Sequence, residues 1–109
     1  MLALLVELQA LPDQRESLVL CLTELTRKAA EEPGIHAYAA QVCEEDANRF
    51  FLYEVYQDRQ AWEAHLAHPP AKALLDQLPA LLAQPPRLLF GERWASFVRP
   101  ETARATTRR

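Results

Sequence analysis

The stretch from Asn48 to His68, NRFFLYEVYQDRQAWEAHLAH, decides the fold, because a strand pattern passes there directly into a helix pattern. It contains five of the nine aromatic residues, so most of the aromatic surface of the chain is concentrated in it. Read at a period of two residues, one face of the strand carries Phe50, Leu52, Glu54 and Tyr56. The opposite face carries Phe51, Tyr53 and Val55.

The helix that follows begins at a residue suited to capping it. The Asp58 carboxylate can accept hydrogen bonds from the free amides of the first turn. Trp62, His65 and Leu66 then follow at helical spacing and share one face. An acid on the strand, Glu54, and an imidazole on the helix, both facing inward, are the best candidates for chemistry in this chain.

Length and composition restrict the class of protein. A chain of 109 residues, half of them apolar and a quarter charged, is typical of one soluble globular domain. We expect no membrane segment, because no apolar run approaches the length of a spanning helix. The N-terminal residues 1–14 alternate like a strand and lack the basic start of a signal peptide. With only Cys21 and Cys43, the sequence favours a reduced, cytoplasmic protein.

The charge is unevenly distributed. Residues 1–98 carry a net charge of −6, whereas residues 99–109 carry four arginines and one glutamate, a net charge of +3. An acidic body gives no electrostatic reason to expect nucleic-acid binding. We therefore predict one folded domain over residues 1–98 and a basic, disordered tail over residues 99–109.

The other elements follow from periodicity and from the proline and glycine breaks. Residues 2–10 alternate as a strand, and Asp13 followed by Glu16 has the spacing of a capping box for a helix reaching about Glu32. That helix has a buried stripe of Leu18, Leu22, Leu25 and Ala29. The remaining elements are a strand at 35–43, a polar turn at 44–48, helical segments at 58–67, 71–78 and 79–82, and a last strand at 87–97.

The short turn between the second strand and the central strand predicts an antiparallel hairpin. If the turn is centred on Asp46, Tyr38 lies opposite Glu54 and His36 lies opposite Tyr56. A slip of one residue would reverse these faces.

The order β-α-β-β-α-β predicts an α+β ferredoxin-like plait with a four-stranded antiparallel sheet. Its helices cover one side of the sheet. We expect the uncovered side to carry Phe50, Leu52, Tyr38 and Tyr56. That surface is too apolar for a solvated face, so a twofold dimer packed sheet to sheet is expected to cover it.

Several short motifs occur in a characteristic order. They are Glu32-Pro33-Gly34, Tyr38, Asn48-Arg49-Phe50, Tyr53-Glu54 and Ala64-His65-Leu66. With these motifs the chain resembles the antibiotic biosynthesis monooxygenase (ABM) family of dimeric α+β barrel proteins. The resemblance covers the body of the chain up to the tail.

The resemblance implies a homodimer that oxygenates a small aromatic or quinol compound with dioxygen and without a cofactor. A base removes a substrate proton, and the resulting anion reduces dioxygen itself, so neither flavin nor metal is required. The chain departs from the family at residues 68–71, His-Pro-Pro-Ala, where the family often has a Ser-Pro-His-Phe-like run. Haem-degrading relatives use an asparagine on the first strand, whereas the only asparagine here is Asn48.

The leading hypothesis assigns His65 as the base and Glu54 as the group that positions it, or as a second base with a raised pKa. The substrate-binding residues are predicted to be Tyr38, Tyr56, Phe50, Leu52 and Trp62. Two alternatives remain open. The same cavity would suit a non-catalytic dimeric protein that binds a small ligand, or an isomerase or decarboxylase that uses the same acid–base pair. Glu54 also has a structural interpretation, in which it pairs with Arg93 or accepts from Tyr38.

Overall fold

The computed structural model describes residues 1–101, so residues 102–109, which make up most of the predicted basic tail, lie outside the described residues. The elements in chain order are β1 (Leu2–Gln9), a 3-10 helix (Pro12–Gln14), α1 (Arg15–Ala29), β2 (Ile35–Cys43), β3 (Asp46–Tyr56), α2 (Arg59–Ala67), α3 (Pro69–Leu75), α4 (Leu78–Leu81) and β4 (Arg87–Glu92). No helix within residues 1–101 has both the length and the apolar character needed to cross a bilayer.

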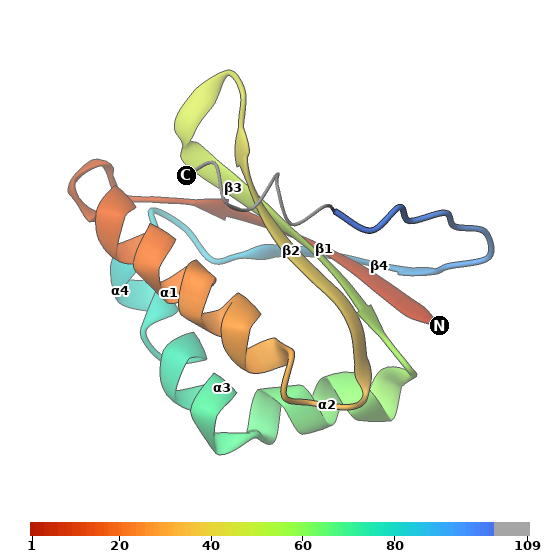
Figure 1. The fold of residues 1–109 in the computed structure, drawn as a ribbon. Helices are drawn as coiled ribbons and strands as arrows, with labels where there is room; N and C mark the ends of the chain where they lie inside the picture. Colours follow the sequence, from red (N-terminus) through yellow and green to blue (C-terminus); the bar gives the residue numbers. More distant parts are fainter. Residues whose placement is uncertain (102–109) are drawn as a thin grey trace.

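The strands form one antiparallel sheet in the order β2-β3-β1-β4. All the α-helices lie on one side of this sheet (Figure 1). The predicted ferredoxin-like α+β fold is therefore confirmed. Residues 48–68 form most of the inner strand β3 and all of the helix α2, so they contribute to both the sheet and the helical layer.

The prediction of which sheet face is uncovered was wrong. The helices cover the face that carries Phe50, Leu52, Glu54 and Tyr56, and these four side chains are at most 5 % exposed. Leu4, Val6 and Leu8 of β1 lie beside them and are buried on the same face. The physical reason is the partner strand, because Leu4, Val6 and Leu8 of β1 extend this face into one apolar surface that the apolar stripe of α1 can bury, whereas Glu7 and Arg49 place charge on the opposite face.

The hairpin register was predicted correctly at one position and wrongly at another. Tyr38 lies opposite Glu54, as expected. Ile35, and not His36, lies opposite Tyr56, because the register shifts between Ile35 and Ala37. This irregularity directs His36 outward, where its Nε2 lies 2.8 Å from the side-chain oxygen of Gln57. The turn is also tighter than predicted, since Cys43 already pairs with Asp46.

The helix starts show one confirmed and one incorrect prediction. The Asp58 side chain accepts a hydrogen bond from the amide of Ala61 at 2.9 Å and caps α2. Asp13 does not cap α1, because it lies inside the preceding 3-10 turn and the helix begins only at Arg15. The predicted stripe of α1 is buried as expected, at Leu18, Leu22, Leu25 and Ala29.

The last strand is shorter than the predicted range of residues 87–97. Strand β4 ends at Glu92, which lies opposite Leu2, the first residue of β1. Beyond this pair only Met1 precedes β1, and its carbonyl accepts from the amide of Arg93 at 3.0 Å. The strand therefore ends where its partner ends, and the chain then reverses direction (Figure 1).

Candidate functional site

A cavity of about 150 Å³ lies between the sheet and the helical layer. Its walls are formed mainly by aliphatic side chains of β1, β3, β4 and α2 to α4: Leu4, Val6, Leu8, Leu52, Leu66, Leu75, Leu78, Pro86 and Leu88. Leu66 and Leu88 are 39 % and 43 % exposed, so they lie where the cavity meets the surface. The lining is predominantly apolar, which is typical of small-molecule pockets in proteins.

Polar groups are few among the lining residues. Tyr38 of β2, Glu54 of β3 and His65 of α2 all border the cavity. The rings of Tyr38 and His65 pack edge to face, with their centroids 5.8 Å apart. Tyr38 and Glu54 are neighbours across the hairpin, so the strand register and the docking of α2 together bring these three groups to the same cavity.

Glu54 is buried, with 4 % of its surface exposed. Burial raises the pKa of its carboxyl to about 7, while hydrogen bonds from Tyr56 and Tyr38 act in the opposite direction. The hydroxyl of Tyr56 donates to Glu54 Oε1 at 2.5 Å. Near neutral pH this carboxyl therefore exists in both protonation states and can either donate or accept a proton.

The two tyrosines remain protonated hydrogen-bond donors. Burial, with the nearby Glu54 as a further cause, raises the pKa of both Tyr38 and Tyr56 well above the usual tyrosine range. Their role at neutral pH is to donate from the hydroxyl group and not to act as bases.

His65 is held by a carboxylate that lies far from it in sequence. Its Nδ1 lies 2.8 Å from Oε2 of Glu32, in the segment between α1 and β2. The side chains of His65 and Glu32 are only 3 % and 12 % exposed. The structure thus places Glu32, and not Glu54, in direct contact with the imidazole.

Comparison with known proteins identifies the family. The sequence model described as "Antibiotic biosynthesis monooxygenase" matches residues 1–77, which is more than half of the chain. The chain belongs to the antibiotic biosynthesis monooxygenase family. The matched range includes every polar residue of the cavity described above.

Solved structures share the fold of this ABM protein. A protein from Nitrosomonas europaea, provisionally named an antibiotic biosynthesis monooxygenase, superposes with a TM-score of 0.83 at 21 % identity, covering 87 % of this chain and 100 % of its own. A second Nitrosomonas europaea protein, of unknown function, has a TM-score of 0.78 at 29 % identity over 92 % of this chain and 95 % of its own.

One curated relative extends beyond the matched region. An uncharacterized protein of Synechocystis sp. is 28 % identical over 74 residues, which is 68 % of this chain. The match spans only half of the length of that relative.

The structure places some of the predicted site residues of this ABM protein at the cavity and others elsewhere. Tyr38, Leu52, Glu54, Trp62 and His65 all border it. Tyr56 does not, because its ring is fully buried and its hydroxyl is directed to Glu54. Phe50, two residues before Leu52 on β3, does not either, since it lines a different hollow with Arg15, whose guanidinium lies 5.5 Å from its ring centroid.

Glu54 has no arginine partner within the described residues. Arg93, which the sequence offered as a partner, lies instead beside Met1, with Nη2 3.6 Å from the methionine sulfur. The alternative interpretation, in which Glu54 accepts from Tyr38, agrees with the hydrogen bond from that tyrosine, and Tyr56 is a second donor that was not expected.

Trp62, which forms one wall of the cavity, packs against Phe90 of β4. Its indole meets the ring of Phe90 edge to face at 5.0 Å, and the Arg59 guanidinium lies 4.4 Å from the centroid of Phe90. Such aromatic and cation–π contacts restrict the rotation of the side chains involved. Trp62 is therefore a fixed wall of the ABM cavity.

Sequence reasoning missed Glu32 as a site residue, although Glu32-Pro33-Gly34 was among the motifs that indicated the family. The only sequence signal for Glu32 was its position directly before the Pro33-Gly34 break. Within residues 1–101, no group of three or more His, Cys, Asp or Glu side chains is arranged to hold a metal ion.

Proposed function

We propose that this protein is a cofactor-independent monooxygenase that acts on a small phenol or quinol, with His65 as the general base. One observation carries the proposal: an imidazole, a carboxyl of perturbed pKa and a tyrosine hydroxyl border one otherwise apolar cavity. Such a combination of titratable groups in a cleft is typical of acid–base chemistry.

The dimensions of the cavity indicate a single-ring substrate. An apolar cavity of about 150 Å³ is large enough for benzene, and the cavity here has about this volume. The lining is mainly apolar, and the described lining residues include no lysine or arginine that could pair with an acidic substrate. A neutral molecule is therefore favoured. A hydroquinone with small substituents satisfies both conditions.

The reaction can be written in balance for a hydroquinone. His65 Nε2 takes a phenolic proton, and the quinolate gives one electron to dioxygen, so that a semiquinone and superoxide form. The semiquinone and superoxide combine through a new C–O bond at an unsubstituted ring carbon. The resulting peroxide takes one proton from the His65 imidazolium and becomes a hydroperoxide. The O–O bond then breaks, the ring carbon loses its hydrogen, and water leaves. The quinol supplies all the electrons and becomes a hydroxyquinone.

Glu54 and Tyr38 would hold the oxygen atoms of the substrate during these steps. A protonated Glu54 can donate to the substrate oxygen that becomes a carbonyl, and Tyr38 can donate to the quinolate. Trp62 and Leu52 would sandwich the ring, because both border the cavity from opposite layers.

The test measures oxygen uptake and product formation with a panel of substituted hydroquinones. Uptake of one dioxygen per hydroxyquinone formed is expected for the wild type, with a loss of about 100-fold or more in His65→Ala. His36→Ala is the matched control, because His36 is exposed and bonded to Gln57 on the outside of the sheet. Absence of uptake, or uptake unaffected by His65→Ala, contradicts the proposal.

A second candidate is an isomerase or decarboxylase that uses the same pair without oxygen. It is favoured by the observation that an acid of pKa about 7 and an imidazole border the same cavity. Deuterium exchange from solvent into an activated ketone, without oxygen uptake, would support it. Stoichiometric binding of phenols by calorimetry without turnover or exchange would instead support a non-catalytic binding protein.

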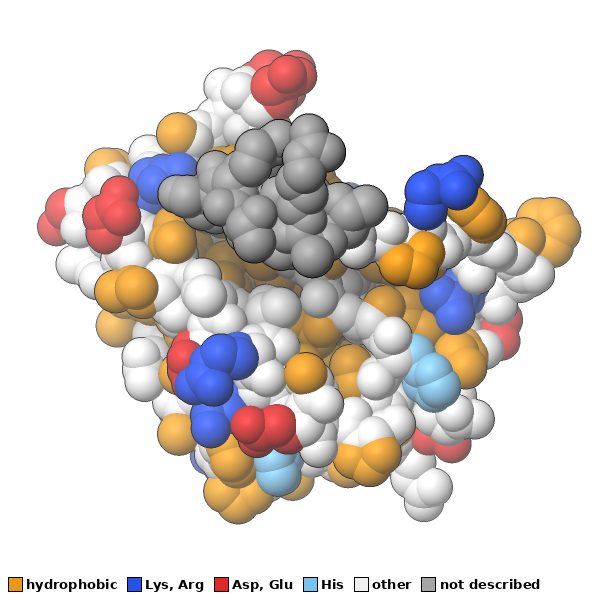
Figure 2. All heavy atoms as spheres, in the orientation of Figure 1, with side chains coloured by type: hydrophobic (Ala, Val, Ile, Leu, Met, Phe, Trp, Pro, Cys, Tyr) orange, Lys and Arg blue, Asp and Glu red, His pale blue; other side chains and the backbone are white. Residues whose placement is uncertain are grey.

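We also propose that a second copy of the chain covers the open face of the sheet. Tyr53 and Leu89 on that face are 38 % and 64 % exposed, and Trp94, Phe97 and Val98 in the following segment are 76 % exposed or more. Figure 2 shows hydrophobic side chains at the surface near the turn after β4. Sedimentation is expected to give a dimer that Leu89→Arg dissociates. A monomeric wild type at high concentration contradicts this.

A further inference from the structure

Glu32 makes a buried contact with His65, although it is not among the residues that line the cavity. Its carboxylate lies 2.8 Å from Nδ1 of His65, and both side chains are shielded from solvent. Removing a carboxylate from water is costly unless a partner compensates. A pair this well shielded differs in kind from the exposed ion pairs of α1, which contribute little.

The segment that carries Glu32 is fixed at both ends. The Glu32 amide donates to the carbonyl of Ala29 at 3.1 Å, and its carbonyl accepts from the amide of Ile35 at 3.0 Å. The carbonyl of Gly34 accepts from the amide of Gln57, just before α2, at 2.8 Å. The segment therefore has little freedom to move relative to His65.

Gly34 allows this segment to approach α2. A Cβ at position 34 would lie 2.9 Å from the Cβ of Ala61, closer than real Cβ atoms approach. Ala61 precedes His65 by one helical turn. The close contact of Gly34 with Ala61 thus brings Glu32 level with the imidazole.

The contact determines which ring nitrogen carries the proton. A carboxylate accepts hydrogen bonds and does not donate them, so Nδ1 of a neutral His65 must be the protonated nitrogen. Nε2 then carries the free lone pair. Within residues 1–101, Nε2 has no hydrogen-bond partner, and the His65 ring borders the cavity.

We propose that Glu32 is a positioning residue that holds His65 in the Nδ1–H tautomer, so that Nε2 is the atom that accepts the substrate proton. In this step the substrate O–H bond breaks and the Nε2–H bond forms. The resulting imidazolium lies against the Glu32 carboxylate, which offsets its charge. The tautomer assignment does not depend on the proposed function. The role of Nε2 as the acceptor of the substrate proton rests on that function.

The first measurement is of the tautomer itself, by long-range ¹⁵N–¹H correlation spectra of the His65 ring. The wild type is expected to show a protonated Nδ1 and a bare Nε2. Glu32→Ala is expected to shift the population toward the Nε2–H form, because the acceptor for Nδ1–H is gone. Assignment uses His65→Gln, in which these signals disappear.

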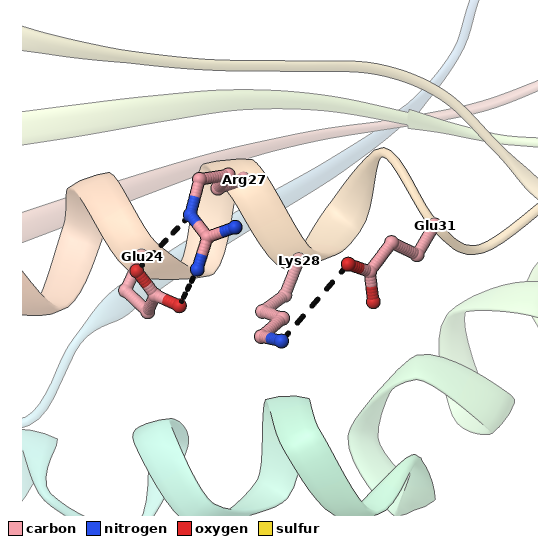
Figure 3. Close-up of polar contacts among 4 residues, drawn as sticks. All are labelled: Glu24, Arg27, Lys28 and Glu31. Carbon is pink, nitrogen blue, oxygen red and sulfur yellow. Dashed lines mark hydrogen bonds and ion pairs between the residues drawn. The ribbon is translucent and has the colours of Figure 1, made fainter.

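The matched control is the neighbouring glutamate. Figure 3 shows the side chains of Lys28, in the last turn of α1, and Glu31, just after α1, pointing toward each other. The Lys28 Nζ to Glu31 Oε2 distance is 3.9 Å, and the Glu31 side chain is 54 % exposed. Glu31→Gln is expected to leave the His65 spectrum unchanged. A wild-type spectrum with the proton on Nε2, or an unchanged tautomer in Glu32→Ala, overturns the proposal.

The second measurement separates positioning from general stability. Glu32→Gln is expected to fold, because the amide oxygen can still accept from Nδ1, but it lacks the charge that stabilises the imidazolium. The expected loss is about 10- to 100-fold, the range that is typical when a carboxylate orienting a metal-bound histidine is removed. The expected loss is in kcat with KM unchanged, and an unchanged kcat overturns the catalytic part. If the wild type takes up no oxygen, the proposed function fails while the tautomer result still stands.

Discussion

The hydroxyl of Tyr56 lies 2.5 Å from Oε1 of Glu54, and both residues are buried beneath the helical layer. They are two positions apart on β3, so their side chains project from the same face of the sheet. A buried carboxyl with a donor this close is stabilised in its ionised form, yet burial still raises its pKa to about 7. Desolvation is therefore the dominant effect at this site.

Glu54→Gln is predicted to change how stability depends on pH. The Glu54 pKa is raised from 4.5 to about 7 by folding, so between these values the folded state retains a proton that the unfolded chain has released. Stability from this group is therefore lost as pH rises through that window, by up to about 3 kcal/mol. Glutamine does not titrate and avoids the loss.

The measurement is urea unfolding of the wild type and Glu54→Gln at pH 4 and pH 8. The variant is expected to gain relative to the wild type at the higher pH. The exposed Glu63 of α2 provides the control variant, Glu63→Gln, which should show no such gain. If the wild type instead becomes more stable than Glu54→Gln as the pH rises, the direction of the Glu54 pKa shift is wrong.

Tyr56→Phe is predicted to raise the pKa of Glu54 above 7. The Tyr56 hydroxyl stabilises the carboxylate, and its removal leaves the desolvation unopposed except for Tyr38. The pKa is measured by following the carboxyl carbon of Glu54 by NMR during a pH titration. Tyr53→Phe, on the opposite face of the same strand, is the control and should leave the titration unchanged. A lower Glu54 pKa in Tyr56→Phe contradicts the argument.

Gly34→Ala is predicted to destabilise the protein by about 1–3 kcal/mol, because its new Cβ overlaps that of Ala61. Ala61→Gly alone should cost about 1 kcal/mol of helix stability. In the double variant the overlap is removed, so the two costs should not add. Gly91→Ala, where nothing lies within 4 Å of the added Cβ, is the control. Additive costs in denaturant unfolding would show that Gly34 and Ala61 do not meet.

Leu52→Ala is predicted to enlarge the cavity and extend binding from phenol to a two-ring naphthol. Leu52 is buried and borders the cavity, so the truncation should also cost about 2–5 kcal/mol of stability. Calorimetric titration of both ligands gives the affinity ratio, and urea unfolding gives the stability. Leu89→Ala, on the open face of the sheet, should leave the ratio unchanged. Naphthol binding as tight in the wild type as in Leu52→Ala would place the ligand elsewhere.

The hairpin shows how far local pattern predicts this fold. Alternation at a period of two and a short polar turn were enough to predict that Tyr38 lies opposite Glu54. The irregularity at His36 was not predictable, because one extra residue in a strand leaves the hydrophobic pattern on either side intact. Of the residues expected to form a site, Tyr38, Leu52, Glu54, Trp62 and His65 border the cavity, whereas Phe50 and Tyr56 do not, and their role in binding or catalysis stays a prediction.

The sequence by itself determined the order of strands and helices, the cap at Asp58 and the buried stripe of α1, because these depend on backbone preferences and side-chain spacing within one element. Only the tertiary structure decided which face of the sheet the helices cover and where β4 ends. It also decided that Glu32 meets His65, which lies 33 residues further along the chain. Such contacts depend on how separate elements dock against one another, and a periodic pattern in one element carries no information about the distance to another.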